Sequence, residues 1–507
     1  MDMSNGLPKI LLCTPELTFW PGSESVSIKR FGRTFHHFRK QRKFQKIGGL
    51  ADITSTLAIE LKQKGVHIAI ALPHIRASEE PELADLIDRQ VENLGSAGIS
   101  HWKHNLFLIQ HDYFNNINRI YEGDGILFSL TLQRLILNAL IPKLKPALIH
   151  THDWPTGFIG PLSHPDIRSL HTIHNFYTKT VPMSLLYNFG LPLYNANKLF
   201  LGESFNHNRV DFQLSGIFGS DYINTPSQGW LSDIVSARVP SWTNPRFIEQ
   251  VRNKFESLRA VSVLNAPDPS YAPEIDSSIY DNFSLETVFE GKKTNKRKFQ
   301  KELWLKQDKD APLIVWTNRA DPHQKGIQFL DQILPGLMRD YQNPGLQIAI
   351  ISDGVYIPKI KRTIHDLEDQ GFRGRIAIRA FSDELERTAY AAGDALLNCS
   401  SYAPCELVQM KGPKYGCIPI VRWVGGLKDT VLPIDEGGYG IVFDDYDANA
   451  LHYGINEFLS IYHGNPEFHK ELVIRTKQFA DDNFTVSKMA DGYIALYEKI
   501  LGRKVHE

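Results

Sequence analysis

The sequence predicts an α/β protein built on two parallel β-sheets, and three observations lead to this fold class. Short apolar segments recur along the chain, and each is bounded by turn residues and followed by a helical pattern, as in buried parallel strands joined by helices. The segment Ala395–Val431 contains this repeat in compact form: a strand, a Pro-Cys loop, a helix, a second strand and a Gly-Gly turn. A chain of 507 residues is also too long for one hydrophobic core, so at least two domains are expected.

The composition is that of an ordinary globular enzyme, with 42% hydrophobic and 22% charged residues, and it indicates neither disorder nor a fibrous class. The net charge of −1 carries no information on partners. The four cysteines match neither a zinc pattern nor a disulfide framework. No apolar run approaches the roughly 18 residues of a membrane span, and the N-terminus lacks the features of a signal peptide. We therefore expect a reduced, cytoplasmic protein without a nucleic-acid or membrane partner.

The first domain is expected over residues 1–257 and begins with a βαβ unit. A first strand is expected at Lys9–Cys13 and a second at His67–Leu72. Between them a helix is expected, with Ile53, Leu57 and Leu61 on one face. The turn Gly48-Gly49 then follows the first strand, at the sheet edge where ligands of open α/β sheets bind. A structural turn is the default interpretation of two glycines, and the adjacent Lys46 modestly favours contact with phosphate or sugar.

A basic and aromatic insert, residues 17–45, precedes this turn. Between Val26 and Lys46 there is no acidic residue, while lysines and arginines alternate with phenylalanines. Such a segment could bind a polyanion or an oligosaccharide. The default interpretation is a solvated loop whose phenylalanines pack on the domain.

Polar side chains end two neighbouring predicted strands, at His150–Trp154 and at His171–Asn175. His150 and His152 share one strand face, so a metal site is one interpretation. The spacing of known histidine metal motifs is absent, and sugar sites also use His, Asp and Asn as hydrogen-bond partners. We favour the second interpretation, with His150 and His171 as ordinary packed residues and no bound metal.

The second domain is expected over residues 258–480, after a domain boundary near Ser257 and a charged linker that includes Gly291–Lys298. Its strands are expected at Leu313–Trp316, Gln347–Ile351, Ile376–Arg379, Ala395–Leu397 and Ile418–Val421. A further strand of the first domain is expected within Gly216–Thr225. Arg319 and Lys325 follow the first of these strands, as two cations suited to a diphosphate. Gly425-Gly426 opens a helix whose N-terminus would favour an anion. Two such sheets facing each other would form a cleft.

Several motifs in consecutive order resemble the glycogen and starch synthase family. They are KIGGLAD (Lys46–Asp52), HTHDWPTG (His150–Gly157), TIHN (Thr172–Asn175), LNAPD (Leu264–Asp268), NRADPHQKG (Asn318–Gly326), APCELVQ (Ala403–Gln409) and YGCIPIVRWVGGLKDTV (Tyr415–Val431). The resemblance covers most of the chain and implies the GT-B fold, two Rossmann-like domains around a cleft, with residues 481–507 crossing back to the first domain. It also implies retaining transfer of glucose from ADP-glucose or UDP-glucose to the non-reducing end of an α-1,4-glucan.

The resemblance further implies a role for each matching residue. The catalytic residues would be Lys46, Asp153, His174, Arg319 and Lys325. The donor-binding residues would be Gly48, Gly49, Asn175, Cys405, Leu407, Gly425, Gly426, Leu427 and Thr430. No metal and no cofactor beyond the nucleotide sugar is implied, and the α-glucan is the other partner.

This chain departs from the family pattern at the chemistry. The glutamate that precedes Pro-Cys in the family is Ala403, and Glu406 stands where the family has glycine. A histidine is replaced by Pro155, a lysine by Leu214, and the spacing from Arg319 to Lys325 is one residue longer. Three functions follow from these observations: a working transferase, with the family's donor and acceptor or altered ones, a catalytically silent relative that binds nucleotide sugar or glucan, and a metal-dependent hydrolase.

Overall fold

The computed structural model describes residues 7–18, 25–30, 33–38, 49–75, 91–93, 97–102, 105–118, 120, 125–201 and 208–506. These residues include two compact units: 7–18, the described parts of 38–265 and 486–506 form the first, and 266–485 with the described parts of 25–37 form the second. Strands β2 (Ser25–Arg30) and β3 (Arg33–Phe38) pair with each other in a small sheet. Most of the basic insert, together with Lys46 and Gly48, lies outside the described residues.

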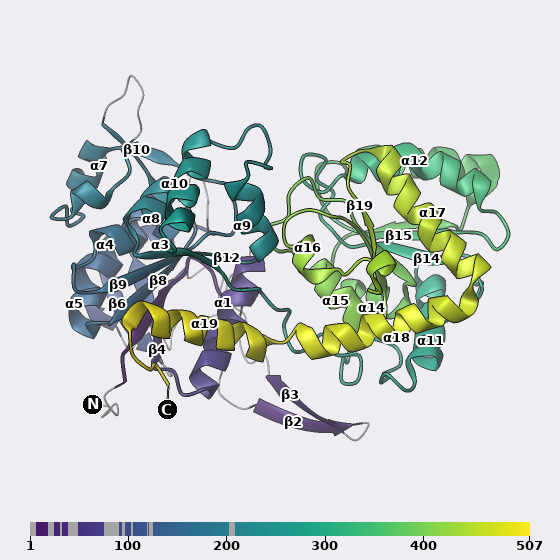
Figure 1. Ribbon diagram of the computed structural model, residues 1–507, viewed down its shortest axis with the longest axis horizontal. Coiled ribbons are helices and arrows are strands. Elements are labelled where there is room, and N and C mark those ends of the chain that lie inside the picture. The colour runs from purple at the N-terminus through teal and green to yellow at the C-terminus, as the bar shows by residue number, and fades with distance from the viewer. Residues whose placement is uncertain are drawn as a thin grey trace. The chain divides into compact units, whose positions relative to one another are not determined.

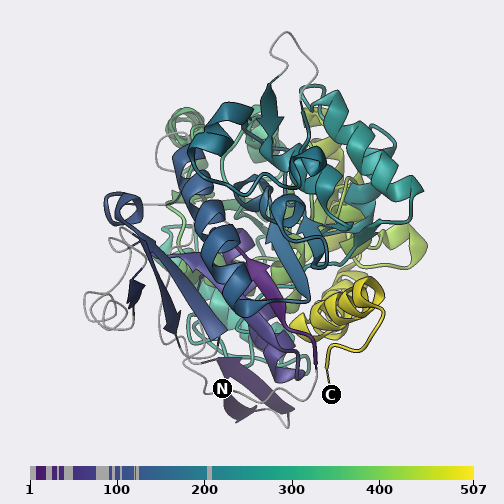
Figure 2. The ribbon, with the colours of Figure 1, turned by 90° about the vertical axis from the view of Figure 1, so that its left-hand side faces the viewer.

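The first unit is organised around a nine-stranded sheet with the order β13-β12-β9-β8-β1-β4-β7-β6-β5 (Figures 1 and 2). Its strands are β1 (Ile10–Cys13), β4 (Ile68–Pro73), β5 (Val91–Asn93), β6 (Ala97–Trp102), β7 (Leu106–His111), β8 (Leu148–His152), β9 (Arg168–Thr172), β12 (Tyr222–Thr225) and β13 (Ala260–Ser262). Pairing is parallel from β13 to β7 and antiparallel for β6 and β5 at the edge. β1 and β4 are buried along their whole length, as their uninterrupted apolar sequences require.

Helices surround this sheet. They are α1 (Gly49–Gln63), α3 (Asp112–Asn115), α4 (Ile126–Leu135), α5 (Ile141–Leu144), α6 (Ile159–Leu162), α7 (Met183–Asn188), α8 (Phe212–Gly219), α9 (Gln228–Val235), α10 (Pro245–Glu256) and α19 (Val486–Leu501), with shorter turns η3 (Ile136–Leu140), η4 (Trp154–Thr156) and η5 (Ala196–Lys198). β10 (Thr180–Pro182) and β11 (Arg209–Asp211) form a separate antiparallel pair. The strand expected within Gly216–Thr225 occupies only the second half of that range, because α8 continues to Gly219. Asp211 caps this helix by accepting the Leu214 amide at 2.8 Å.

One helical run, Ile126–Leu144, is long and apolar enough to cross a membrane by length and composition, and 61% of it is buried inside the fold. This run was not recognised from the sequence because Ser129, Gln133 and Arg134 interrupt it. Ser129 and Gln133 bond to each other at 2.9 Å, and Gln133 accepts the Phe158 amide at 2.6 Å. The run therefore has the contacts of a core helix of the first unit.

The last helix, α19, belongs to the first unit and packs against α1. The Tyr497 hydroxyl lies 2.8 Å from His150 Nδ1, and the Asn224 amide donates to the Tyr493 hydroxyl at 3.0 Å. These two tyrosines tie the chain's end to the strands β8 and β12. The chain passes from the first unit to the second after Asn265, later than Ser257, because β13 still pairs with β12.

The second unit has a six-stranded, wholly parallel sheet with the order β16-β15-β14-β17-β18-β19 (Figure 1). Its strands are β14 (Leu313–Trp316), β15 (Gln347–Ile351), β16 (Ile376–Arg379), β17 (Ala395–Asn398), β18 (Ile418–Arg422) and β19 (Ile441–Phe443). The five strands expected from the sequence are confirmed to within one residue, and β19 was not foreseen. The order reverses between β14 and β17, which makes their carboxyl ends the point where such sheets bind ligands.

The helices of this unit are α11 (Val288–Glu302), α12 (Ile327–Asp340), α13 (Ile357–Leu367), α14 (Asp383–Ala392), α15 (Val408–Lys414), α16 (Leu427–Thr430), α17 (Ala448–Gly464) and α18 (Pro466–Asn483), with the turns η6 (Glu368–Phe372) and η7 (Ile434–Glu436). The charged linker expected at Gly291–Lys298 is wrong, because these residues lie within α11. Lys292 is buried there and donates to the carbonyls of Gly393, Tyr415 and Tyr390 at 2.6, 3.1 and 3.2 Å.

Candidate functional site

Asp153 follows the carboxyl end of β8, where the structure holds it in an unusual conformation. Its φ of 54° lies in the region that disfavours side chains other than glycine. Its carboxylate accepts the His174 amide at 2.7 Å and the Asn175 side-chain amide at 2.9 Å. Three of the residues expected at the sugar site thus come together at the ends of β8 and β9. Backbone strain that is fixed by such contacts is typical of functional positions.

The histidines at these strands form a group in which His150, His152 and His171 are buried and His174 is half-buried. His152 Nδ1 and His174 Nε2 lie 3.0 Å apart, and the two rings are stacked. His150 Nε2 lies 2.7 Å from the Thr172 hydroxyl, and His171 Nδ1 lies 2.8 Å from the Thr151 hydroxyl, so both are the packed, hydrogen-bonded residues expected. Burial lowers the pKa of His174 to about 3 and keeps its ring neutral near pH 7.

Burial also raises the pKa of Asp153 to about 7, against the opposing effect of the His174 amide bond. A carboxyl group whose pKa is higher in the folded than in the unfolded chain stabilises the fold at low pH, and this contribution is lost as the pH rises through 7. Asp153→Asn removes the titration. Between pH 5 and pH 8, the unfolding free energy of the native chain should therefore fall by on the order of 2 kcal/mol more than that of the variant. Urea unfolding of both proteins at the two pH values measures this change, and a difference independent of pH would contradict the raised pKa.

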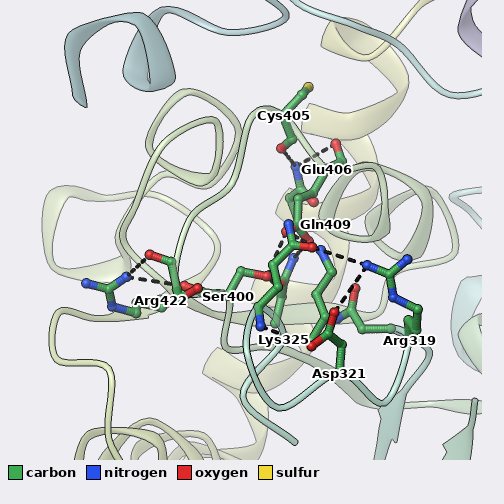
Figure 3. A network of polar contacts seen from close by, with 12 residues as sticks. Arg319, Asp321, Lys325, Ser400, Cys405, Glu406, Gln409 and Arg422 are labelled. Atoms are coloured by element: carbon green, nitrogen blue, oxygen red, sulfur yellow. Dashed lines mark hydrogen bonds and ion pairs between the residues drawn. The ribbon is translucent and has the colours of Figure 1, made fainter. Parts of the chain in front are cut away.

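In the second unit, a buried ion pair joins the loops after β14 and β17. Lys325 Nζ lies 2.5 Å from Glu406 Oε1, and the two side chains are 13% and 5% exposed. Glu406 also accepts the Ser400 hydroxyl on Oε1 and the Asn398 amide on Oε2, both at 2.7 Å (Figure 3). The two loops meet closely because Gly326 has φ 74° and a side chain there would overlap the Cys399 carbonyl.

Arg319 lies on the same loop as Lys325 but is held less firmly. Its guanidinium lies 3.4 Å from Asp321 and 3.3 Å from Gln324, and its side chain is 60% exposed (Figure 3). An exposed pair of this length contributes little to stability. The loop thus presents one cation to solvent and keeps the other in an internal pair.

The Gly-Gly turn after β18 packs on the backbone of Ala403. Gly425 has φ 50°, and a side chain there would overlap the Ala403 carbonyl. That carbonyl accepts the Gly426 amide at 2.8 Å, and the Leu427 amide donates to Val424 at 3.0 Å. These two amides would have to exchange partners to reach a ligand, so the anion site expected at the start of α16 is not preformed.

The remaining expected donor residues surround the Gln409 side chain. Its amide lies 3.0 Å from the Cys405 carbonyl, 3.1 Å from the Glu406 carbonyl and 3.1 Å from the Thr430 hydroxyl. The Thr430 hydroxyl donates to Gly426 at 2.7 Å, and Leu407 caps α15. Gln409 therefore holds the Pro-Cys loop and the Gly-Gly turn together.

The geometry gives no support to a metal centre in the part of the chain that the structure describes. No group of three His, Cys, Asp or Glu side chains there is placed to hold a metal ion. Gly49, the remaining expected contact of the first unit, is exposed at the start of α1. The pairing of Glu406 with Lys325 was not predicted from the sequence, although an acidic residue in a glycine position was a visible signal.

Comparison with known proteins identifies the source of this arrangement. A family model described as the starch synthase catalytic domain matches residues 41–240. A glycogen synthase of Exiguobacterium sibiricum is 29% identical over 90% of this chain and 96% of its own length. A glycogen synthase of Desulforamulus reducens is 29% identical over 90% of this chain and 96% of its own length. Over most of its length, this chain is similar to glycogen synthases and starch synthases.

Solved structures agree on the fold. The catalytic domain of starch synthase IV from Arabidopsis thaliana has a TM-score of 0.76 at 23% identity and covers 98% of this chain and 100% of its own. Sucrose-phosphate synthase from Thermosynechococcus elongatus has a TM-score of 0.58 at 15% identity, with 98% and 99% covered. These likenesses confirm the GT-B class of two Rossmann-like domains.

Proposed function

We propose that this chain is a retaining hexosyltransferase that transfers glucose from ADP-glucose or UDP-glucose to the non-reducing end of an α-1,4-glucan. The observation that carries the proposal is the pair Arg319 and Lys325, which follows the carboxyl end of β14 at the point where the strand order reverses. The similarity to glycogen synthases over 90% of the chain supports the reaction type. The starch synthase IV structure, which contains ADP and acarbose, supports a nucleotide and a glucan-like chain as the two ligands.

The chemistry of the reaction explains why two cations are needed. Breaking the bond from C1 to the nucleotide leaves negative charge on the diphosphate and positive charge on the sugar. Arg319 and Lys325 would stabilise the diphosphate, and this interaction is strongest in the transition state. Neither cation would need to move a proton.

The residues of the first unit would bind the glucose. The Asp153 carboxylate already fixes the His174 amide and the Asn175 side chain, so it orients both neighbours. His174 is neutral and bonds through Nε2 to His152, and its Nδ1 would meet the 6-hydroxyl. These contacts would select a hexose and hold its C1 in position.

A catalytically silent relative is the second candidate, because Ala403 favours it. Ala403 carries no carboxylate to stabilise the cationic sugar, and its side chain is fully buried with Val421, Val424, Leu427 and Val431. A silent relative would still bind nucleotide sugar or glucan. The retained cations favour the enzyme, since binding alone does not require both at the leaving group. The four cysteines, all within the described residues, form no disulfide, which fits a cytoplasmic location for either.

A donor panel tests the proposal. Purified protein is incubated with ADP-glucose, UDP-glucose and other nucleotide sugars, with and without glycogen, while nucleoside diphosphate release and polymer extension are measured. Release that depends on glycogen is expected, and it also names the donor. Nucleotide-sugar binding without release would instead establish the silent relative.

A further inference from the structure

Lys325, the cation expected at the diphosphate, already has an anionic partner inside the fold. Its ammonium lies 2.5 Å from Glu406 Oε1. The Ser400 hydroxyl and the Asn398 amide complete the coordination of this carboxylate at 2.7 Å each (Figure 3). A cation, a hydroxyl and an amide at such distances are the donors that a phosphate oxygen would require. The site is therefore built for an anion and filled by the chain itself.

The backbone conformation of Glu406 places its carboxylate at Lys325. Its φ of 65° lies in the left-handed region, which is unfavourable for residues other than glycine. The neighbouring backbone is fixed by the Gln409 amide, which contacts the carbonyls of Cys405 and Glu406. The fold thus holds Glu406 in a strained conformation, and its carboxylate contacts Lys325.

We propose that the Glu406 carboxylate is an internal anion that occupies the phosphate position of Lys325 and competes with the diphosphate of the donor and of the product. The proposal rests on the function proposed above, since it gives Lys325 the diphosphate as its ligand. Arg319, whose side chain is 60% exposed, makes the first contact with the diphosphate. Lys325 engages only when Glu406 leaves, so that the site binds nucleoside diphosphate more weakly than its cations alone would allow.

The geometry disfavours the other role of this residue, a relocated catalytic carboxylate. Both oxygens of Glu406 already accept bonds, and the side chain is only 5% exposed. A carboxylate in this state presents no oxygen to a sugar. Its charge instead cancels that of Lys325, and the cancellation predicts a change in anion affinity when the charge is removed.

The test measures the affinity of the full-length protein for ADP, UDP and inorganic pyrophosphate by titration calorimetry. Glu406→Gln removes the charge and keeps the side-chain size, whereas Glu406→Gly also relieves the backbone strain. Both variants should bind at least one nucleoside diphosphate, and pyrophosphate, at least about tenfold more tightly than the native chain. Thermal melting of each variant establishes that it is folded.

Two variants serve as controls. Glu406→Asp keeps the charge and should stay closer in affinity to the native chain than either neutral variant. Glu467→Gln makes the same chemical change in an exposed pair with Lys470 on α18, where the side chain is 83% exposed, and should leave the affinity unchanged. Equal gains in Glu467→Gln would assign the effect to net charge and overturn the proposal.

The remaining outcomes separate the two proposals. If the native chain extends glycogen but Glu406→Gln binds no more tightly, the internal anion is refuted and the transferase stands. A gain restricted to Glu406→Gly would assign the effect to backbone strain and also refute it. If neither the native chain nor the variants bind any of the three probes or release diphosphate, both proposals fail.

Discussion

Lys325→Met is expected to lower the rate of glucose transfer by about 10²–10³-fold, the loss that follows removal of one donor to a developing negative charge. Methionine keeps the length and apolar body of lysine but cannot neutralise the leaving diphosphate. The loss should fall mainly on kcat, because the charge that Lys325 stabilises is largest in the transition state. Initial rates of diphosphate release with glycogen as acceptor measure it.

The same substitution should also destabilise the fold, by about 3 kcal/mol, because it leaves the Glu406 carboxylate buried without its cation. The double variant Lys325→Met/Glu406→Gln removes both charges, and Asn398 and Ser400 can still donate to the glutamine carbonyl. It should recover most of the stability and none of the turnover. Urea unfolding midpoints and initial rates of the native chain, both single variants and the double variant measure the two effects separately.

Recovery of turnover in the double variant would show that Lys325 acts on stability alone, which would remove it from the diphosphate site. Equal stability of the native chain and Lys325→Met would show that the Glu406 carboxylate does not depend on Lys325 for its stabilisation. The first result would contradict the role of Lys325 in turnover, and the second would contradict the buried pair as the link between the two loops.

The parallel strands were predictable because their signal is local. Leu313–Trp316 and Gln347–Ile351 are uninterrupted apolar runs bounded by turn residues, and the structure confirms both ranges. The carboxyl ends of such strands share one edge of a sheet, so the proximity of Asp153 to the His174 backbone also followed from the pattern. The family motifs supplied the GT-B class.

Other features depend on partners that are distant in the sequence. The charged segment Gly291–Lys298 forms a helix that its sequence does not predict. Lys292 is buried there because it donates to carbonyls about a hundred residues away in the sequence. Glu406 and Lys325 are separated by 81 residues. Neither residue type predicts a buried pair, since glutamate and lysine are usually solvated. The sequence therefore marked Glu406 as unusual but not as the partner of Lys325.

The structure also changes what restoring the family's glutamate at position 403 should do. The Ala403 side chain packs in an apolar cluster, and its carbonyl is bonded to the Gly426 amide. A carboxylate introduced there alone would be desolvated among valines, while Lys325 stays neutralised by Glu406. We therefore expect Ala403→Glu by itself to give no gain in glucan synthesis.

The double variant Ala403→Glu/Glu406→Gly recreates the family's Glu-Pro-Cys-Gly-Leu sequence and should transfer glucose about a hundredfold faster than Glu406→Gly, which corresponds to about 2.7 kcal/mol of barrier. The glycine frees Lys325 and relaxes the backbone at φ 65°, which allows the Pro-Cys loop to turn the new carboxylate toward the sugar. That carboxylate would then stabilise the positive charge on C1. Glycogen-dependent diphosphate release by the two variants, at saturating donor, gives the comparison. A double variant no faster than Glu406→Gly would show that position 403 no longer faces the chemistry, and that this chain stabilises the sugar cation by other groups.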